Sequence, residues 1–249
     1  MAGSPRIVRL APNGAGLKPI GIDPVDFQSP PLRQNLQICF SDPEIGLNVG
    51  VWDSTRMQEA FGPYPGDEFV LVLDGAFSMV DGAGGALQAK AGEMAAFRNG
   101  APMSWKQDGY LRKFFLTLLA PRAAAPEIAT AEGGFIVIDP AEALSDDDIL
   151  PESESTGSGA LERERIFFRN DAGTMTVGLW DCRAFDGEAM SPFPCHELCV
   201  MADGEVTIRE PGGVEQTFLP GDVFFVPKGA MCSWHVPRYI RKFFATVYP

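Results

Sequence analysis

Residues 220–234 read PGDVFFVPKGAMCSW, a short apolar segment enclosed by two turns. The turns PGD and PKG combine proline, which fixes φ, with glycine, which allows a positive φ. The segment VFFV between them has the length and composition of a buried strand. Similar segments recur along the chain, separated by DG, GG or PG turns about every 8 to 12 residues, and none of them keeps a helical period. The pattern predicts an all-β protein.

An internal repeat organises these segments. VGVWD at residues 49–53 returns as VGLWD at residues 177–181, and after a one-residue insertion the two copies match at an offset of 129 residues (197 minus 68 for the first glutamate pair). Identical side chains in the two copies include Glu68 and Glu197, Trp105 and Trp234, and Lys113 and Lys242. The duplication predicts two tandem antiparallel β-barrels of about 100 residues each.

The repeat also suggests domain boundaries. We expect an N-terminal barrel with a leading arm in residues 1–121 and a C-terminal barrel in residues 164–249. Residues 122–163 are predicted to be a linker that begins the second repeat and carries an acidic insert, SDDDILPESESTGSG. The two barrels would pack as a pseudo-dimer within a monomer, or the chain would form a homodimer.

Composition excludes several classes of partner. The 249 residues include 20 basic and 33 acidic ones, a net charge of −13, so we expect no binding to nucleic acid or to an anionic membrane. No apolar run approaches the roughly 20 residues that span a bilayer. The five cysteines form no CxxC pair, which favours reduced thiols over a disulfide framework. We therefore expect a soluble, cytoplasmic protein.

The second copy resembles a known family. It contains ELCVMADGEVTI, PGDVFFVPKGAMCSW and IRKFF in this order, and the first copy is a looser match with FRNGAPMSW. This pattern resembles the cupin superfamily, most closely the branch of ureidoglycine aminohydrolase and the cupin-type ethanolamine-utilisation protein. The resemblance implies two cupin barrels of the jelly-roll type, a bicupin, from a branch that acts on small nitrogen-containing metabolites. It does not decide the function, because cupin barrels host many unrelated activities.

The usual cupin metal site is not expected here. In that family, two histidines precede the strand glutamate and a third follows the Pro-x-Gly turn. Counting from Glu197 and Gly229 places Ser191, Phe193 and Cys232 at these positions, and the first copy has Gly62, Tyr64 and Met103. The chain contains two histidines in all, so a three-histidine site is excluded.

The cysteines leave an alternative metal site open. Side chains alternate along a strand, so if Glu197 points inward then Cys195 and Cys199 do too, and His196 points outward. Together with Cys232 they would form a soft ligand set, Cys195, Cys199, Cys232 and Glu197, that suits zinc. The other interpretation, which we favour, is that the thiols fill the barrel as small apolar groups. We predict no cofactor and keep a divalent metal as the alternative.

The paired glutamate and lysine have a functional and a structural interpretation. Lys242 would bind a substrate carboxylate and Glu197 would act as a general base, or the two would form an internal ion pair that fixes the barrel. Trp234 would stack on a planar ligand or close the barrel end. Trp52 and Trp180 are expected to be structural and to pack between the two halves.

The second copy is the better candidate for a functional site, because it has the clearer turn motifs and the thiol cluster. Its predicted ligand-binding residues are Glu197, Cys199, Cys232, Trp234 and Lys242, and their first-copy equivalents are Glu68, Met103, Trp105 and Lys113. The leading hypothesis is binding of a small nitrogen-containing or carboxylate metabolite without the usual metal. A metal-dependent hydrolase or lyase with cysteine and glutamate ligands, and a structural or regulatory scaffold, are the alternatives.

Overall fold

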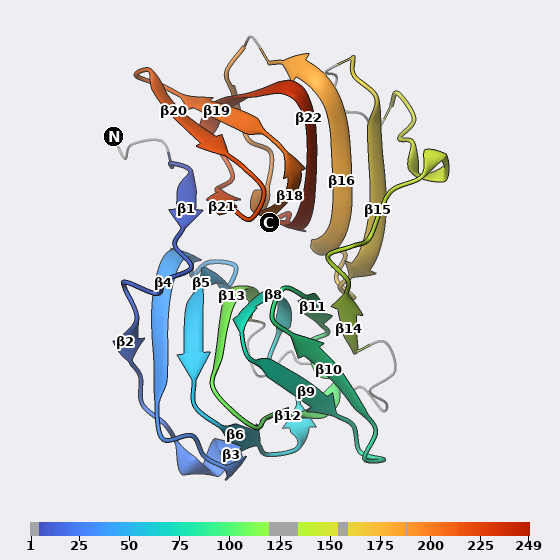
Figure 1. Ribbon diagram of the computed structural model, residues 1–249. Helices are drawn as coiled ribbons and strands as arrows, with labels where there is room; N and C mark the ends of the chain where they lie inside the picture. Colours follow the sequence, from blue (N-terminus) through green and yellow to red (C-terminus); the bar gives the residue numbers. More distant parts are fainter. Residues whose placement is uncertain (1–4, 120–133, 154–158, 188) are drawn as a thin grey trace. The chain divides into compact units, whose positions relative to one another are not determined.

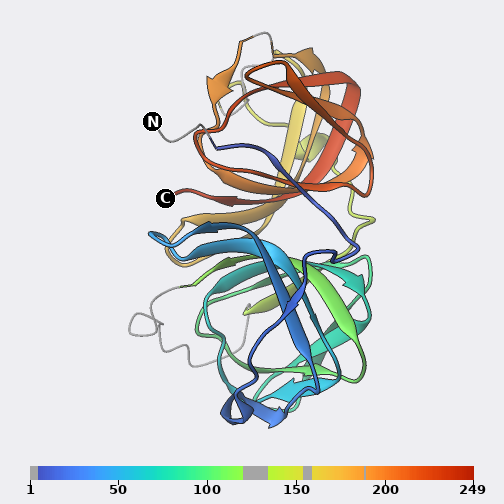
Figure 2. The ribbon, with the colours of Figure 1, turned by 90° about the vertical axis from the view of Figure 1, so that its left-hand side faces the viewer.

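The computed structural model describes residues 5–119, 134–153, 159–187 and 189–249. The chain forms two compact units. We call Ala11–Pro140 the N-terminal unit, and Met1–Leu10 together with Ala141–Pro249 the C-terminal unit. In each unit the strands curl around one interior (Figure 2). The described residues contain no α-helix, which confirms the predicted all-β class, and within them no helix is long and apolar enough to cross a membrane.

The described part of the N-terminal unit contains thirteen strands in two main antiparallel sheets. The strands are β2 (Lys18–Pro19), β3 (Phe27–Ser29), β4 (Gln34–Asp42), β5 (Leu47–Ser54), β6 (Met57–Glu59), β7 (Gly62–Pro63), β8 (Asp67–Asp74), β9 (Ala76–Val80), β10 (Ala86–Lys90), β11 (Met94–Phe97), β12 (Pro102–Gln107), β13 (Leu111–Leu118) and β14 (Phe135–Ile138). One sheet has the order β14-β11-β8-β13-β5-β4-β2 and the other β10-β9-β12-β6-β3. A short 3-10 helix, η1 (Pro24–Asp26), precedes β3.

The C-terminal unit repeats this architecture. Its strands are β1 (Val8–Leu10), β15 (Glu162–Arg169), β16 (Met175–Asp186), β17 (Ser191–Pro192), β18 (His196–Gly204), β19 (Val206–Glu210), β20 (Val214–Phe218), β21 (Val223–Val226) and β22 (Met231–Val247). The sheet order is β1-β21-β18-β22-β16-β15, and β19 pairs with both β20 and β22. A short 3-10 helix, η3 (Asp146–Asp148), lies in the acidic insert before β15.

The strand registers of the two units coincide. Lys113 on β13 lies opposite Trp52 on β5, and Lys242 on β22 lies opposite Trp180 on β16. The DG turn that leaves each motif strand also repeats, because Gly75 has φ +80° and its counterpart in the second copy has φ +75°. A side chain at Gly75 would collide with the backbone carbonyl of the facing strand. The structure therefore reproduces the sequence repeat residue by residue.

The end strands depart from the predicted domain boundaries. β1 pairs with β21 in the C-terminal unit, whereas β14 pairs with β11 in the N-terminal unit (Figure 1). The leading arm thus belongs to the C-terminal unit rather than to residues 1–121. The physical reason is burial, because Ile7 is 6% exposed within that hydrophobic core and its N–H donates to the buried carboxylate of Glu210.

Backbone hydrogen bonds show which residues of the two copies correspond to each other before the VGxWD repeat begins. The N–H of Ile20 donates to the carbonyl of Gln34, and the N–H of Leu150 donates to the carbonyl of Glu162. Gln34 and Glu162 occupy the same place at the start of β4 and β15. The equivalent of Ile20 is therefore Leu150, at the end of the acidic insert.

Candidate functional site

A buried ion pair lies inside the C-terminal unit. Glu197 on β18 and Lys242 on β22 project to the same side of the sheet, and the Lys242 ammonium donates to Oε1 of Glu197. Their side chains are only 6% and 8% exposed. Burial lowers the pKa of Lys242, but the neighbouring Cys199 and Glu197 raise it by more, so the net pKa lies above its usual value. Lys242 is therefore held as a cation.

Aromatic rings surround this cation. The Nζ atom of Lys242 lies 5.0 Å from the ring centroid of Trp180, 5.4 Å from that of Trp234 and 5.3 Å from that of Phe244. Cation–π attraction adds to the ion pair and offsets part of the cost of burying the charge. The expectation that Trp180 packs between the two halves is wrong, because its ring lies against Lys242 inside its own unit.

A cavity of about 910 Å³ opens beside this ion pair. Its wall residues come from the C-terminal unit alone and are Leu150, Glu162, Glu164, Trp180, Phe185, Asp186, Gly187, Ala189, Ser191, Phe193, Pro194, Cys195, Glu197, Cys232, Ser233, Trp234, Lys242, Phe244, Thr246 and Tyr248. Four of the five predicted ligand-binding residues are among them. The fifth, Cys199, is fully buried, and its thiol donates to Oε1 of Glu197 at 3.3 Å. It supports the glutamate rather than lining the cavity.

The thiols are poor metal ligands in this setting. Burial, followed by the nearby Glu197, raises the pKa of Cys195 to about 12 and raises that of Cys199 as well. Burial also raises the pKa of Cys232. Since a thiolate is the form that binds metal, these groups stay protonated near neutral pH. Among residues 5–119, 134–153, 159–187 and 189–249, no group of three or more His, Cys, Asp or Glu side chains is arranged to hold a metal ion.

The usual cupin ligand positions do not fit a metal either. Ser191 lies opposite Cys232 across β17 and β22. The four ligand positions then carry the hydroxyl of Ser191, the phenyl ring of Phe193, the protonated thiol of Cys232 and the carboxylate of Glu197. Because Lys242 already neutralises that carboxylate, a second cation there would meet a like charge.

His196 lies outside the cavity, as strand alternation predicts. Its Nδ1 accepts the N–H of Lys228 at 3.2 Å, and its ring stacks on Phe225 with centroids 5.9 Å apart. It is nonetheless buried, with 4% exposure. Its visible contacts are structural ones at the PKG turn.

The N-terminal unit has the same ion pair in a filled interior. Lys113 Nζ lies 2.7 Å from Oε1 of Glu68 and faces the rings of Trp52 and Trp105 at 5.3 and 4.5 Å. The Tyr64 hydroxyl donates to the second oxygen of Glu68. The space that a ligand would need beside the glutamate is thus taken by a side chain.

Further aromatic rings complete this filling. The Tyr64 ring stacks on Phe97 with centroids 4.6 Å apart, and Trp105 stacks on Phe77 at 3.8 Å. Met103 is buried as well, at 4% exposure. At the matching positions the C-terminal unit has the smaller or less polar residues Phe193 for Tyr64, Val226 for Phe97, Val206 for Phe77 and Cys232 for Met103. These differences favour the C-terminal unit as the location of the site.

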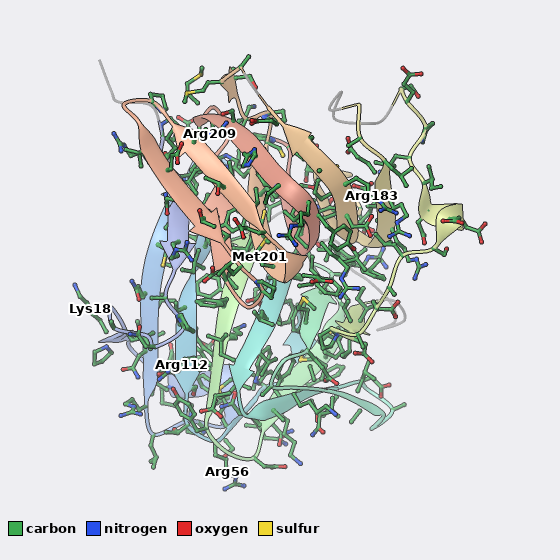
Figure 3. All side chains as sticks on the ribbon, turned by 45° about the horizontal axis from the view of Figure 1, so that its top comes forward. Lys18, Arg56, Arg112, Arg183, Met201 and Arg209 are labelled. Carbon is green, nitrogen blue, oxygen red and sulfur yellow. The ribbon has the colours of Figure 1, made fainter. Side chains whose placement is uncertain are left out.

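Three carboxylates of the cavity wall were not predicted. Glu162 is only 2% exposed and accepts the indole N–H of Trp180 at 3.2 Å. Glu164 lies two residues further along the same strand, and Asp186 ends β16, where it pairs with Arg209 at 2.8 Å. Arg209 is labelled in Figure 3. The first copy has Gln34, Leu36 and Gln58 at the equivalent positions. A comparison of the two copies could have found these carboxylates, because the second copy has acidic residues where the first has neutral ones.

Residues 169–244 match the family model of the EutQ-like cupin domain. The C-terminal unit thus matches the cupin superfamily over these residues. Solved structures agree with this cupin fold. A protein of unknown function of the DUF861 family from Pseudomonas syringae is 24% identical, with a TM-score of 0.69 over 97% of this chain and 99% of that one.

More distant cupin-fold structures also match. A cupin 2 conserved barrel domain protein from Leptotrichia buccalis is 8% identical, with a TM-score of 0.55 over 93% of this chain and 98% of its own. The protein Ylba from Escherichia coli is 11% identical, with a TM-score of 0.54 over 99% and 93%. At these identities the likeness concerns the fold alone. Among curated proteins, none matches this chain in sequence.

Proposed function

We propose that this cupin binds a small nitrogen-containing or carboxylate metabolite in the cavity of its C-terminal unit, without a metal at the usual cupin position. The supporting observation is the Lys242–Glu197 pair in the cavity wall. An ammonium has three N–H donors and Glu197 accepts one of them. A ligand acceptor can take another, and Trp234 offers a flat apolar surface beside it.

The state of Lys242 favours binding over covalent chemistry. A lysine whose pKa is raised stays protonated and is neither a nucleophile nor a base near neutral pH. Its role is to orient a ligand and to supply a fixed positive charge. Glu197, which already accepts from Lys242 and Cys199, holds that charge in place.

A thermal-shift screen of ureides, amino acids and small carboxylates tests this proposal. A ligand at 100 times its dissociation constant stabilises the folded state by about 2.7 kcal/mol. We expect Glu197→Gln to abolish the shift. Glu68→Gln is the matched control, since it breaks the same ion pair in the filled unit and leaves the shift intact. A shift that survives Glu197→Gln would exclude this cavity.

Metal analysis separates the alternative of a metal-dependent hydrolase or lyase. The protein is purified without a histidine tag and its transition metals are quantified. Less than about a tenth of an equivalent supports a metal-independent site. A stoichiometric metal that is lost in a Cys195→Ser/Cys232→Ser variant would support the alternative instead.

A further inference from the structure

The carboxylate of Glu197 uses one of its two oxygens for contacts within the protein. Its Oε1 accepts a hydrogen bond from the ammonium of Lys242 and another, at 3.3 Å, from the thiol of Cys199. Among the residues that the structure describes, none donates a hydrogen bond to Oε2. Oε2 is not fully buried, and Glu197 lines the cavity, so a ligand in the cavity can reach this oxygen.

The N-terminal unit shows which group completes such a carboxylate. There, Lys113 donates to Oε1 of Glu68 at 2.7 Å, and the hydroxyl of Tyr64 donates to Oε2. The residue that matches Tyr64 in the second copy is Phe193, at the same offset of 129 residues (193 minus 64). Its phenyl ring has no donor. The C-terminal unit therefore lacks the protein's own donor to Oε2 in the copy that has a cavity beside this oxygen.

Lys242 provides a hydrogen-bond donor next to this acceptor. An ammonium has three N–H groups, one of which meets Oε1 of Glu197, and the lysine also lines the cavity. The ion pair thus offers a ligand one donor and one acceptor side by side. A ligand group that satisfies both must have an acceptor and a donor on the same edge. The C=O and N–H of a primary carboxamide or of a lactam meet this requirement.

The charges of the pair favour an uncharged ligand at this place. Lys242 and Glu197 neutralise each other, so the pair has no net charge to attract an ion. A ligand carboxylate has two acceptors and no donor, and it would bring a like charge beside Oε2 of Glu197. An amidinium group has donors only, and it would meet the ammonium of Lys242. An amide edge avoids both conflicts.

We infer that the ligand is an uncharged carboxamide or lactam, whose C=O accepts from Lys242 and whose N–H donates to Oε2 of Glu197. The rings of Phe193, Trp234 and Phe244 in the cavity wall provide apolar surface for the rest of a planar molecule. The inference rests on the proposed function and narrows it, since it selects nitrogen-containing ligands with an amide edge over carboxylates.

Four probes of nearly the same shape test the amide edge. Benzamide has the acceptor and the donor, acetophenone has a methyl group in place of the donor, benzoate is an anion with two acceptors, and benzamidine is a cation with donors only. Isothermal titration calorimetry is expected to show benzamide binding at least about tenfold more tightly than each of the others, a difference of about 1.4 kcal/mol. Equal or tighter binding of any other probe, or no binding of benzamide, would overturn the inference but leave the proposed function in place.

Glu197→Gln should reverse the recognition. Its side-chain amide keeps an acceptor for Lys242 and presents N–H groups in place of Oε2. Benzamide should therefore lose at least about tenfold in affinity and benzoate should become the tighter of these two probes, while acetophenone stays unchanged. Glu68→Gln breaks the same ion pair in the filled N-terminal unit and is the matched control, which should leave the affinities of all four probes as they are.

Phe193→Tyr is a second variant that keeps the ion pair. It supplies a donor to Oε2 from the protein itself, as Tyr64 does to Glu68, and should abolish the preference for benzamide over acetophenone. Tyr64→Phe should leave that preference intact. A preference that persists in both Glu197→Gln and Phe193→Tyr would refute the inferred contact with Oε2. Failure of every probe and of the metabolite screen would refute the proposed function as well.

Discussion

The ammonium group of Lys242 meets the carboxylate of Glu197 across β22 and β18, at the same place where Lys113 meets Glu68 in the N-terminal unit. Both pairs are buried, so each charge offsets the desolvation of its partner. The two copies have kept this pair while their surroundings diverged. One pair is enclosed by Tyr64 and the other opens into a cavity.

Removing one member of the C-terminal pair should be strongly destabilising. Lys242→Met leaves Glu197 buried and uncompensated, and we expect a loss of about 3 to 5 kcal/mol in the free energy of unfolding, measured by urea denaturation. Glu197→Gln should cost less, because the amide still accepts a hydrogen bond. The double variant should lose less than the sum of the two single losses. Additive losses would mean that the two groups are not energetically coupled.

The N-terminal arm should stabilise the distant C-terminal unit. Ile7→Ala removes a side chain that is 6% exposed in that core, with an expected cost of about 2 to 5 kcal/mol. Hydrogen exchange should become faster in Val223–Val226, the strand that β1 pairs with. Arg6→Ala, at an exposed neighbouring position, should change stability by less than about 0.5 kcal/mol. Faster hydrogen exchange that is confined to the N-terminal unit would contradict the pairing of β1 with β21 in the C-terminal unit.

Introducing the first copy's tyrosine should close the cavity. Phe193 occupies the position of Tyr64 and stacks on Trp234 with centroids 5.9 Å apart. In Phe193→Tyr the new hydroxyl is expected to donate to Glu197, as Tyr64 does to Glu68, and to lower ligand affinity about tenfold with a change in stability below about 1.5 kcal/mol. Tyr64→Phe is the control and should leave binding unchanged. Binding that is intact in Phe193→Tyr would place the ligand away from Glu197.

The N-terminal unit should lose stability as the pH rises. Burial raises the pKa of Glu59 from 4.5 to about 7. The positive charge of Lys113 opposes this rise, whereas the carboxylates of Glu68 and Asp26 add to it. The folded unit therefore binds a proton more tightly than the unfolded chain, so stability is greatest below pH 4.5 for this group and falls between pH 4.5 and 7.

Glu59→Gln provides the control for this pH dependence. The amide does not titrate, so the slope of unfolding free energy against pH in that window should become flatter. An identical slope in the wild type and in Glu59→Gln would show that another group is responsible. The C-terminal unit has Gly187 at the matching position, so its own stability should not show this component.

The sequence was sufficient for the fold and for part of the site. Turn residues and strand alternation are local patterns, and the repeat allows each pattern to be compared between two copies. Together they predicted the all-β class and the inward position of Glu197. The meeting of Lys242 with Glu197 followed from their recurrence at matching positions in both copies. Assigning both residues to a binding site stays a prediction that the probe experiments address.

Other features depended on long-range pairing and were missed. Trp180 faces Lys242 because β16 lies beside β22, a neighbour relationship that no local pattern specifies. Glu162 was assigned to a linker, since the start of β15 follows an acidic insert without a clear strand pattern. The pairing of β1 with β21 and of β14 with β11 likewise depends on which sheet edge each strand meets. This choice is decided by packing rather than by the β propensity of the strand.

The pairing of β1 with β21 affects when the C-terminal unit can fold during synthesis of the chain. A ribosome makes β1 long before its partner β21, which is completed only at Val226, and β11 waits for Phe135–Ile138 before its own edge is covered. The N-terminal unit is contiguous and has all its strands once Pro140 has been made, whereas the C-terminal unit combines the early strand β1 with the late strand β21. Completion of the C-terminal barrel must wait for β21, so nascent chains arrested before this strand would leave the apolar side chain of Ile7 without the core that buries it.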